Sequence, residues 1–479
     1  MLLGVMRRGS GHLMSPLDRR RFLLLLSSAG IAIAGCRKDS DDAPREPAGT
    51  PGPGGTIGEV NVDVIVVGAG VAGLVAAREL RRAGKRVILV GARDRVGGRV
   101  QTSDALGVPL DLGAAWIHGS GEDQPLVAHA RECGVRTVVT DFDEVALHVG
   151  STRVDKEARR RSQEDFRSAI ERVRTEGKAG EPLGAIFRRA IAELGLDGDA
   201  ARLVDWQLAA FENDYAEESD RLDARQFDRD SAFAGDDLLL LDGYRTVMDG
   251  LARDLDVRLS HRVQAIDHTG DRVRVETDRG MLFTQQVIVT LPLGVLKQGS
   301  VAFNPELPDR KRAAIRKLGV GAFMKVALRF PQAFWPTDRA VLGLAGRSHG
   351  EFPLFLSVQA NHDAPILVGM VVGNVARELE TAPDEEVLAS AQSALRAMFG
   401  AAIPAPTAHA ITRWGVDPFA LGAYSGAAVG VAPDDYEALP APVGSKLFFA
   451  GEATAATHNA TVHAALLSGI REAKRIAAP

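Results

Sequence analysis

The sequence predicts an α/β fold built on a Rossmann-type unit, and two features after residue 61 carry this prediction. Residues 62–67 read VDVIVV, an apolar and β-branched run typical of a buried parallel strand. Residues 68–73 read GAGVAG, and this GxGxxG spacing opens a predicted helix that ends near Arg82, with a second strand at 86–90. A strand, this glycine spacing, a helix and a strand in that order predict a dinucleotide-binding site.

The glycines and the end of the second strand bear on what this unit binds. Glycines in this pattern permit the tight turn, the approach of the backbone to a pyrophosphate and close packing of the helix on the sheet, while the helix N-terminus adds partial positive charge. The second strand runs into Gly91, where such units usually place an acidic residue for the ribose hydroxyls. Three explanations are open: a cofactor held more weakly, compensation by a nearby group such as Asp94, or a lost site.

The composition is that of a globular protein with a large core. The 479 residues are 46% hydrophobic and 25% charged, which argues against a coiled coil, a collagen-like repeat or a mostly disordered chain. A net charge of −5 argues against a nucleic-acid binder, and two cysteines, Cys36 and Cys133, cannot form a disulfide framework. No pair of histidines has the spacing of a metal site, so no metal is expected.

Residues 1–36 have the pattern of an export signal. Arg19 and Arg20 precede an apolar run at 22–34, which is too short for a bilayer span of about 20 residues but typical of a signal peptide. The arginine pair resembles a twin-arginine signal, which serves proteins that fold before they cross the membrane. Residues 33–36 (IAGC) resemble a bacterial lipobox, in which Cys36 becomes the lipidated first residue of the mature protein. The alternative is an ordinary cleaved signal with an incidental cysteine.

The segment after this signal predicts a tether. Residues 37–60 are rich in Asp, Pro and Gly and show no hydrophobic period, so we expect a flexible linker. Signal and linker together predict a periplasmic or cell-surface protein that reaches the membrane through a lipid anchor at Cys36.

Five further segments follow one another in the order of a family signature. They are residues 91–99 (GARDRVGGR), 111–119 (DLGAAWIHG), 291–297 (LPLGVLK), 448–454 (FFAGEAT) and 461–469 (TVHAALLSG). This set resembles the motifs of flavin-containing amine oxidases. Within that family, the segments at 243–245 and 255–259 look most like those of polyamine oxidases and the related lysine-demethylase branch.

The resemblance implies a two-domain architecture, in which a Rossmann-type FAD-binding domain is interleaved with an α+β substrate domain. The FAD-binding domain would comprise residues 61–140, 230–295 and 405–479, and the substrate domain residues 141–229 and 296–404. FAD would be bound noncovalently, because no cysteine occupies the linking position near the C-terminal motif. Independently, the charged stretch at 151–178 predicts a helix whose Phe166, Ile170 and Val173 face a core.

The resemblance also assigns a set of cofactor contacts. Glu452 follows a predicted strand at 446–450 and is expected to open the final helix, with its carboxylate near the ribityl and pyrophosphate region; the alternative is a plain helix-capping acid. Thr461 and Val462, at a helix start, would present their backbone to the isoalloxazine. Arg93 and Arg99 would neutralise phosphate or support the loop. The full implied set is Gly68, Gly70, Ala72, Gly73, Arg93, Gly98, Arg99, Ala115, Trp116, Val263, Glu452, Thr461 and Val462.

Lys325 is the residue expected to take part in the chemistry. It lies in an otherwise apolar run, FMKVAL at 323–328, where a lysine either extends to water or is buried for a purpose. The resemblance implies that this lysine holds a water on the flavin N5.

The expected substrate pocket contains Trp414, Tyr424, His118 and His458. Aromatic rings on either side of a substrate nitrogen favour an amine through cation–π contacts, and Trp414 and Tyr424 match family positions near this pocket. His458 stands where relatives carry a tyrosine; a neutral imidazole can still stack, whereas a protonated one repels a cationic amine. His118 either lines the pocket or caps a turn.

The activity implied is oxidation of an amine, with polyamine-like amines favoured, to an imine and then an aldehyde while O2 is reduced to H2O2. Two alternatives stay open. One is a flavin oxidoreductase for another substrate such as an amino acid, which requires a cation for the substrate carboxylate. The other is a non-catalytic lipoprotein that has lost FAD. The expected partners are therefore a small-molecule amine, O2 and the membrane, and no nucleic acid.

Overall fold

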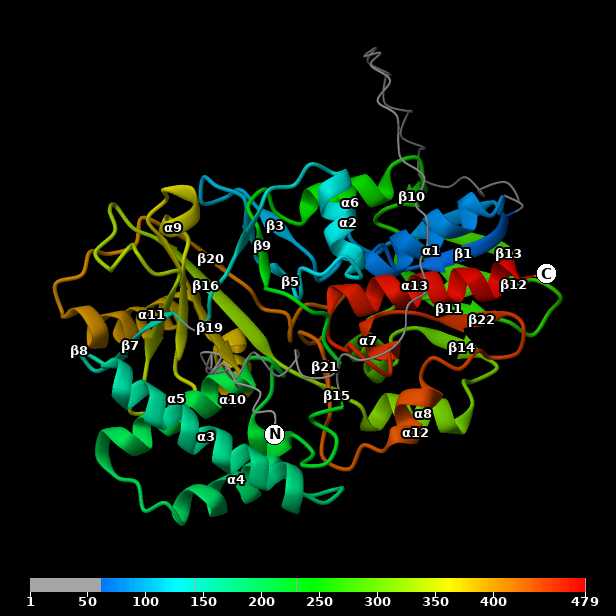
Figure 1. The fold of residues 1–479 in the computed structure, drawn as a ribbon. Coiled ribbons are helices and arrows are strands. Elements are labelled where there is room, and N and C mark those ends of the chain that lie inside the picture. The colour runs from blue at the N-terminus through cyan, green and yellow to red at the C-terminus, as the bar shows by residue number, and fades with distance from the viewer. Residues whose placement is uncertain (1–61, 143, 230, 479) are drawn as a thin grey trace, which may run out of the picture.

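The computed structural model describes residues 62–142, 144–229 and 231–478 (Figure 1). The predicted export signal with Arg19, Arg20 and Cys36, and the predicted linker at 37–60, lie outside the described residues. Among the residues described, no helix combines the length and the apolar character that crossing a bilayer requires.

Thirteen α-helices and two 3-10 helices are assigned in the described part of the chain. They are α1 (Val71–Arg82), α2 (Pro125–Glu132), α3 (Lys156–Glu176), α4 (Leu183–Ala192), α5 (Gly198–Glu212), η2 (Ser219–Arg221), α6 (Arg245–Ala252), α7 (Leu293–Gln298), α8 (Asp309–Lys317), α9 (Gln359–His362), α10 (Gly373–Thr381), α11 (Asp384–Phe399), α12 (Pro433–Ala438), η3 (Glu452–Thr454) and α13 (Val462–Ala477).

The first large sheet has eight strands in the order β10-β2-β1-β13-β12-β11-β14, with β22 paired to β13. The strands are β1 (Val62–Val67), β2 (Val87–Val90), β10 (Asp256–Arg258), β11 (Val263–Asp267), β12 (Val273–Thr277), β13 (Gly280–Val289), β14 (Ala302–Asn304) and β22 (Leu447–Phe449). Strand β1 pairs in parallel with both β2 and β13, so that Val64 lies between Val87 and Gln286. The predicted strand, glycine turn, helix and strand are confirmed.

Helices α1 and α13 lie side by side against this sheet (Figure 1). Leu74 of α1 and Leu466 of α13 are buried in one core with Val66 of β1. The two helices approach closely because Gly469 has no side chain; a Cβ there would lie 2.4 Å from the carbonyl oxygen of Ala72. The beginning and the end of the described chain therefore build one structural unit.

The second large sheet has seven strands in the order β20-β16-β19-β18-β17-β7-β8. The strands are β7 (Val145–Val149), β8 (Thr152–Arg153), β16 (Phe323–Arg329), β17 (Val341–Leu344), β18 (Leu354–Ser357), β19 (Ile366–Val372) and β20 (Ala408–Ile411). Successive residues of a strand face opposite sides. Leu367 accordingly packs in a core with Leu395 of α11, whereas Val368 packs in another with Trp206 of α5.

Helices α3, α4 and α5 form a layer with a core of its own (Figure 1). The predicted charged helix is α3, and its Phe166, Ile170 and Val173 are all buried in this core, as predicted. This helical layer adjoins the second sheet through α5 and β7.

Short strand pairs lie between the two large sheets (Figure 1). They are β3 (Thr102–Ser103) with β4 (Leu110–Asp111), β5 (Trp116–Ile117) with β9 (Leu238–Leu240) and β6 (Thr137–Val139), and β15 (Gly319–Val320) with β21 (Ser425–Gly426). The pairs of β9 with β5 and β6, and of β15 with β21, join segments that are distant in the sequence, whereas β3 and β4 are close in the sequence.

Sheet membership corrects the predicted domain division at two places. The segment after residue 296 was predicted to enter the substrate domain, yet β14 pairs with β11 of the first sheet, and Ile315 of α8 is buried in the core beneath it. Conversely, β20 follows the predicted boundary at residue 405 but pairs with β16 of the second sheet. In both places the domain boundary depends on the pairing of two strands that are distant in the sequence, and the local sequence does not reveal such pairing.

Helix α8 carries a buried lysine that makes fold stability depend on pH. The Nζ of Lys311 donates to the carbonyl oxygen of Ala438 at 3.1 Å and lies 3.8 Å from the centre of the Phe449 ring. Burial lowers the pKa of Lys311 from 10.5 to about 7. In that interval the unfolded chain binds the proton and the folded chain does not, so this residue makes the free energy of unfolding rise with pH.

We therefore expect Lys311→Met to remove part of that pH dependence. The stability of the wild type should rise by roughly 1–3 kcal/mol between pH 7 and pH 10 relative to the variant, because each pKa unit corresponds to about 1.4 kcal/mol. Urea unfolding curves of both proteins across this range measure the difference. Parallel stability profiles would contradict the expectation.

Candidate functional site

A cavity of about 370 Å³ extends from the glycine turn after β1 to strands β16, β18 and β19 of the second sheet. All the residues predicted to contact a cofactor line it, except Gly73. Of the other predicted site residues, Lys325, His118, Trp414 and Tyr424 line the same cavity, and His458 does not. The structure thus brings together residues from nearly the whole described chain.

The glycine turn is shaped by tertiary contacts. Gly68 has φ +117°, and a Cβ there would lie 2.3 Å from the Thr290 Oγ1, which itself donates to the carbonyl oxygen of Val67 at 2.9 Å. A Cβ on Gly73 would lie 1.9 Å from the carbonyl oxygen of Gly68, so this glycine serves helix packing. At Gly70, by contrast, the nearest atom to such a Cβ is 3.9 Å away. The space beside Gly70 at the start of α1 is therefore open to an anionic ligand.

This contrast yields a prediction for two alanine variants. Gly70→Ala should leave the stability of the apoprotein within about 1 kcal/mol of the wild type, since its backbone is extended, but raise the Kd for FAD at least about tenfold. Gly73→Ala should destabilise the fold by roughly 1–3 kcal/mol, as overpacking does. Urea unfolding of the apoproteins and fluorescence titration with FAD separate the effects; equal behaviour of the two variants would contradict the assignment.

Gly91 lines the cavity at the end of β2. A Cβ there would lie 2.8 Å from the Ala69 side chain, so the local packing favours glycine. Asp94 is not part of the cavity wall, which leaves compensation by Asp94 without support. The wall near Gly91 instead includes His261 and Arg262.

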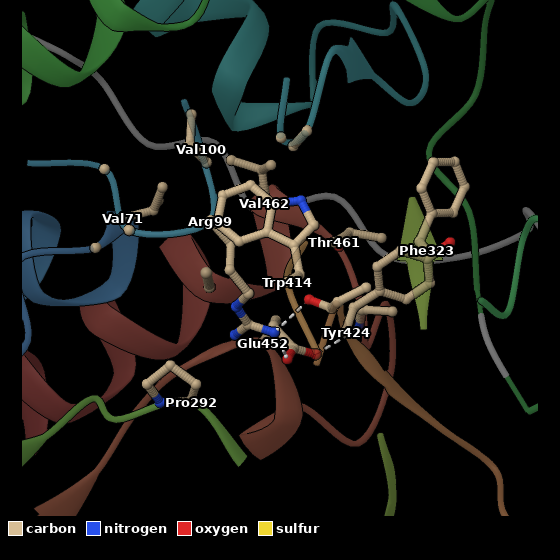
Figure 2. Close-up of a pocket in the computed structure, with 18 of the residues that line it drawn as sticks. Val71, Arg99, Val100, Pro292, Phe323, Trp414, Tyr424, Glu452, Thr461 and Val462 are labelled. Carbon is tan, nitrogen blue, oxygen red and sulfur yellow. Dashed lines mark hydrogen bonds and ion pairs between the residues drawn. The ribbon is translucent and has the colours of Figure 1, made fainter. Parts of the chain in front are cut away.

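Glu452 lines the cavity and joins three segments of the chain there (Figure 2). One carboxylate oxygen accepts from the Arg99 guanidinium at 2.8 Å, and the other accepts from the Ser425 hydroxyl at 2.6 Å and the Ala460 backbone N–H at 3.0 Å. Its side chain is 8% exposed. These partners are tertiary, so the carboxylate does more than cap a helix.

The prediction that Glu452 opens the final helix is wrong. Glu452 lies in the short helix η3, and α13 begins only at Val462, with the Thr461 hydroxyl accepting from the Ala464 N–H at 3.1 Å. The intervening loop contains His458 and Ala460 in the left-handed region, at φ +60° and +65°, which interrupts helical geometry. The predicted helix start at Thr461 and Val462 is confirmed.

Arg93 is held by a partner from the C-terminal part of the chain. Its guanidinium makes two hydrogen bonds to the Asp417 carboxylate, at 2.7 and 2.9 Å, and lies 5.5 Å from the centre of the Phe419 ring. A guanidinium has five N–H donors, so the pair leaves donors for a group in the cavity.

Lys325 is buried on β16, with 5% of its surface exposed, and does not extend to water. Its Nζ donates to the carbonyl oxygens of Asp111 at 2.9 Å and Gly113 at 2.7 Å, and lies 5.5 Å from the Trp116 ring centre. Burial lowers its pKa to about 8, while the nearby Asp111 carboxylate opposes the shift. With three N–H donors on an ammonium and two in use, one remains for a group in the cavity.

Asp111 supports this lysine and was not singled out by the sequence analysis, although it begins the DLGAAWIHG motif. Its carboxylate accepts from the Thr102 hydroxyl at 2.5 Å and the Tyr244 backbone N–H at 3.1 Å. Burial raises its pKa to about 6. Only the folded chain shows that this acid lies beside Lys325.

Aromatic side chains line the cavity near Lys325. Trp414, Tyr424 and Phe323 project toward it in Figure 2, and the Tyr424 hydroxyl donates to the Asn213 carbonyl oxygen at 2.5 Å. His118 lines the wall as well, with its Nδ1 3.2 Å from an Asp237 carboxylate oxygen.

His458 is placed away from the cavity wall, which differs from the predicted pocket position. Its ring stacks on Phe233 with centroids 4.8 Å apart, and its Nε2 lies 3.2 Å from the Ser231 hydroxyl. The ring also lies edge-on to His463, with centroids 5.1 Å apart. The aromatic part of the cavity wall is therefore formed by Trp414, Tyr424 and Phe323, without His458.

Several polar cavity residues carry no signal in the sequence. They lie on α3, on α5 and in the loops that follow α5 and precede β9, and they are Arg159, Gln163, Gln207, Asn213, Asp214 and Asp237. In a charged amphipathic helix such residues are typical of the solvated face. Only the position of the helical layer shows that they border a site.

Comparison with known proteins agrees with this geometry. The sequence profile of the family described as flavin containing amine oxidoreductase matches residues 71–477. Polyamine oxidase 5 of Oryza sativa subsp. japonica is 36% identical over 425 residues, which cover 85% of this chain and 86% of that protein. Probable polyamine oxidase 4 of Arabidopsis thaliana is 34% identical over 444 residues, covering 87% and 89%.

Other matches extend this picture. Lysine-specific histone demethylase 1 homolog 3 of Oryza sativa subsp. japonica is 36% identical over 438 residues, covering 86% of this chain and 54% of that protein. Among solved structures, a putrescine oxidase redesigned in cofactor binding superposes with a TM-score of 0.72 at 22% identity, over 87% of this chain and 99% of the other. The structural match supports the predicted fold.

Proposed function

This chain belongs to the flavin-containing amine oxidoreductases, and from that premise we propose that it oxidises an elongated, polyamine-like amine and uses O2 as electron acceptor. The chain is an FAD-dependent oxidoreductase. The observation that supports the proposed substrate class is the similarity to polyamine oxidases at 34–36% identity, together with the aromatic side chains of Trp414 and Tyr424 on the wall of the cavity that also holds Lys325.

The residues present fit FAD. The open space beside Gly70 at the start of α1 suits a pyrophosphate, and Arg99, fixed by Glu452, lies further along the cavity. The backbone N–H groups at the start of α13 border the same space through Thr461 and Val462. Loss of the flavin site finds no support in this geometry, and noncovalent attachment remains part of the proposal.

FAD, when bound, would supply the redox chemistry, in which the substrate loses two electrons and two hydrogens, one from the carbon beside the amine nitrogen and one from that nitrogen, and O2 then accepts them and becomes H2O2. The amine becomes an imine, and addition of water to the imine gives an aldehyde together with a shorter amine, if a secondary amine was oxidised, or with ammonia, if a primary amine was oxidised. The side chains of the protein orient the substrate amine and a water in the cavity. Aromatic rings hold the amine by cation–π contact, and the Lys325 ammonium donates a hydrogen bond to a water at the cavity wall.

The test is anaerobic addition of spermidine, or of putrescine, to the purified FAD-loaded protein. Bleaching of the flavin band at about 450 nm, followed by peroxide formation when air is admitted, is the expected result. A flavin band that persists with a panel of primary and secondary amines would refute amine oxidation of this class.

For the N-terminal region we propose export and lipidation at Cys36, on the basis of its arginine pair and lipobox-like residues. In bacterial cells supplied with radiolabelled palmitate, the full chain should take up label and enter the membrane fraction. Cys36→Ser should abolish the label, whereas Cys133→Ser should retain it. If the full chain takes up no label, or if Cys36→Ser takes up as much label as the full chain, lipidation at Cys36 is refuted.

A further inference from the structure

Helix α3 contributes an arginine to the cavity wall. Arg159 lines the cavity, as does Gln163 one turn further along the helix. The Arg159 Nη1 donates to the carbonyl oxygen of Val145 at 3.1 Å, and the side chain is half-buried. The burial of Phe166 and Ile170 in the helical core fixes the rotation of α3, and so fixes which side chains meet the cavity.

The neighbours of Arg159 on this helix behave differently. Arg160 and Arg161 pair with Glu157, and Arg160 also pairs with Glu164, on the exposed side of α3. Over the described stretches of the chain, no ion pair includes Arg159. A guanidinium has five N–H donors, and the Val145 carbonyl takes one, so Arg159 lines a ligand-sized space and retains donors for a ligand.

A short series of contacts places Arg159 near the reacting end of the cavity. Val145, its backbone partner, lines the wall together with Phe142. The Phe142 ring centre lies 5.5 Å from that of Trp116, which in turn lies 5.5 Å from the Lys325 Nζ. The arginine therefore belongs to the end built from the second sheet, where the substrate is proposed to bind, and not to the glycine turn.

The charges of this end have both signs. Asp214 and Asp237 line the cavity as acids, with Asp237 next to His118, while Arg159 adds a cation. An ammonium close to a partly desolvated guanidinium is repelled, whereas a carboxylate forms a charge-assisted and often bidentate pair with it.

On the basis of the proposed function, we propose that Arg159 selects an amine that also carries a carboxylate, so that the preferred substrate is a carboxylated polyamine rather than a purely cationic one. The guanidinium binds the carboxylate, which positions the amine carbon at the Lys325 end. In this role Arg159 determines specificity and takes no part in the redox step.

Two substrates of matched length test the proposal. Spermidine is compared with N-(3-aminopropyl)-4-aminobutanoate, in which a carboxylate replaces the terminal aminomethyl group. The wild type should show a kcat/KM at least about tenfold higher for the carboxylated amine. Butanoate, which has no amine, should inhibit spermidine oxidation competitively and so reports binding without turnover.

Arg159→Gln should lower kcat/KM for the carboxylated amine by about 10- to 100-fold and change that for spermidine less than about threefold. It should also weaken inhibition by butanoate at least about tenfold. Arg159→Lys keeps the charge without the planar fork and should give an intermediate loss. Arg160→Gln removes the same charge from the exposed side of the same helix and should behave as the wild type.

The outcomes separate this inference from the proposed function. If the wild type oxidises spermidine without preferring the carboxylated amine, or if Arg159→Gln and Arg159→Lys affect both substrates equally, the assignment of Arg159 is overturned while amine oxidation stands. If neither amine reduces the bound flavin, the proposed function fails and the inference fails with it. FAD content and urea unfolding, measured on each variant, identify a loss of fold.

Discussion

Lys325→Met is expected to lower kcat for the best amine substrate by about 100-fold or more, the lower end of what the loss of one positioned hydrogen-bond donor costs. The substitution removes the ammonium that the Asp111 and Gly113 carbonyls hold at the cavity wall. Methionine fills a similar volume, so FAD content, measured from the visible spectrum, should stay near that of the wild type. Steady-state kinetics measure the loss.

The pH profile distinguishes this role from simple packing. The folded pKa of Lys325 is about 8, so the charge is present below that pH and is lost above it. Electrostatic stabilisation of negative charge that develops in the cavity should therefore decline as pH rises through about 8, and this falling limb should be missing in Lys325→Met.

Lys311→Met is the matched control for the removal of a buried lysine. Lys311 is also buried, but it lies on α8 and outside the cavity wall. Its replacement should change stability and leave kcat and the falling limb in place. If both variants lose activity to the same extent, or if Lys325→Met keeps the full rate, the proposed role of Lys325 is refuted.

Glu452→Ala is expected to destabilise the protein by roughly 3–5 kcal/mol and to lose most of its FAD, because it leaves a partly buried Arg99 guanidinium without its carboxylate. The Ser425 hydroxyl and the Ala460 N–H lose their acceptor at the same time. Urea unfolding and FAD fluorescence titration measure the two effects.

Glu452→Gln serves as the conservative comparison. A glutamine keeps one carbonyl acceptor for the network but not the charge. We therefore expect Glu452→Gln to lower the free energy of unfolding by less than half as much as Glu452→Ala does. Glu157→Ala, which removes an exposed acid from α3, should change stability by less than about 0.5 kcal/mol. A Glu452→Ala protein with wild-type stability and FAD affinity would contradict the network described here.

Local order along the chain was enough to predict the Rossmann-type beginning. The apolar run at 62–67, the glycines at 68–73 and the strand that follows are consecutive in the sequence, so their order and spacing were enough to predict these elements, although β1 also pairs with the distant β13. The amphipathic period of α3 likewise predicted the burial of Phe166, Ile170 and Val173. Of the site residues that the family motifs predicted, all but Gly73 and His458 line the cavity.

Which of these residues contact one another, and which further residues line the cavity, was decided by the tertiary structure. Glu452 meets Arg99 and Ser425 only because β22, the loop after β2 and β21 converge, and Asp111 meets Lys325 only because β4 approaches β16. His458 turns aside because Phe233, from a distant loop, offers a stacking surface. Pairing and packing between distant segments depend on how the chain closes its long loops, and residue spacing in one sequence does not encode that closure. For the same reason Arg159 had the pattern of a solvated helix face until the fold placed it on the cavity wall.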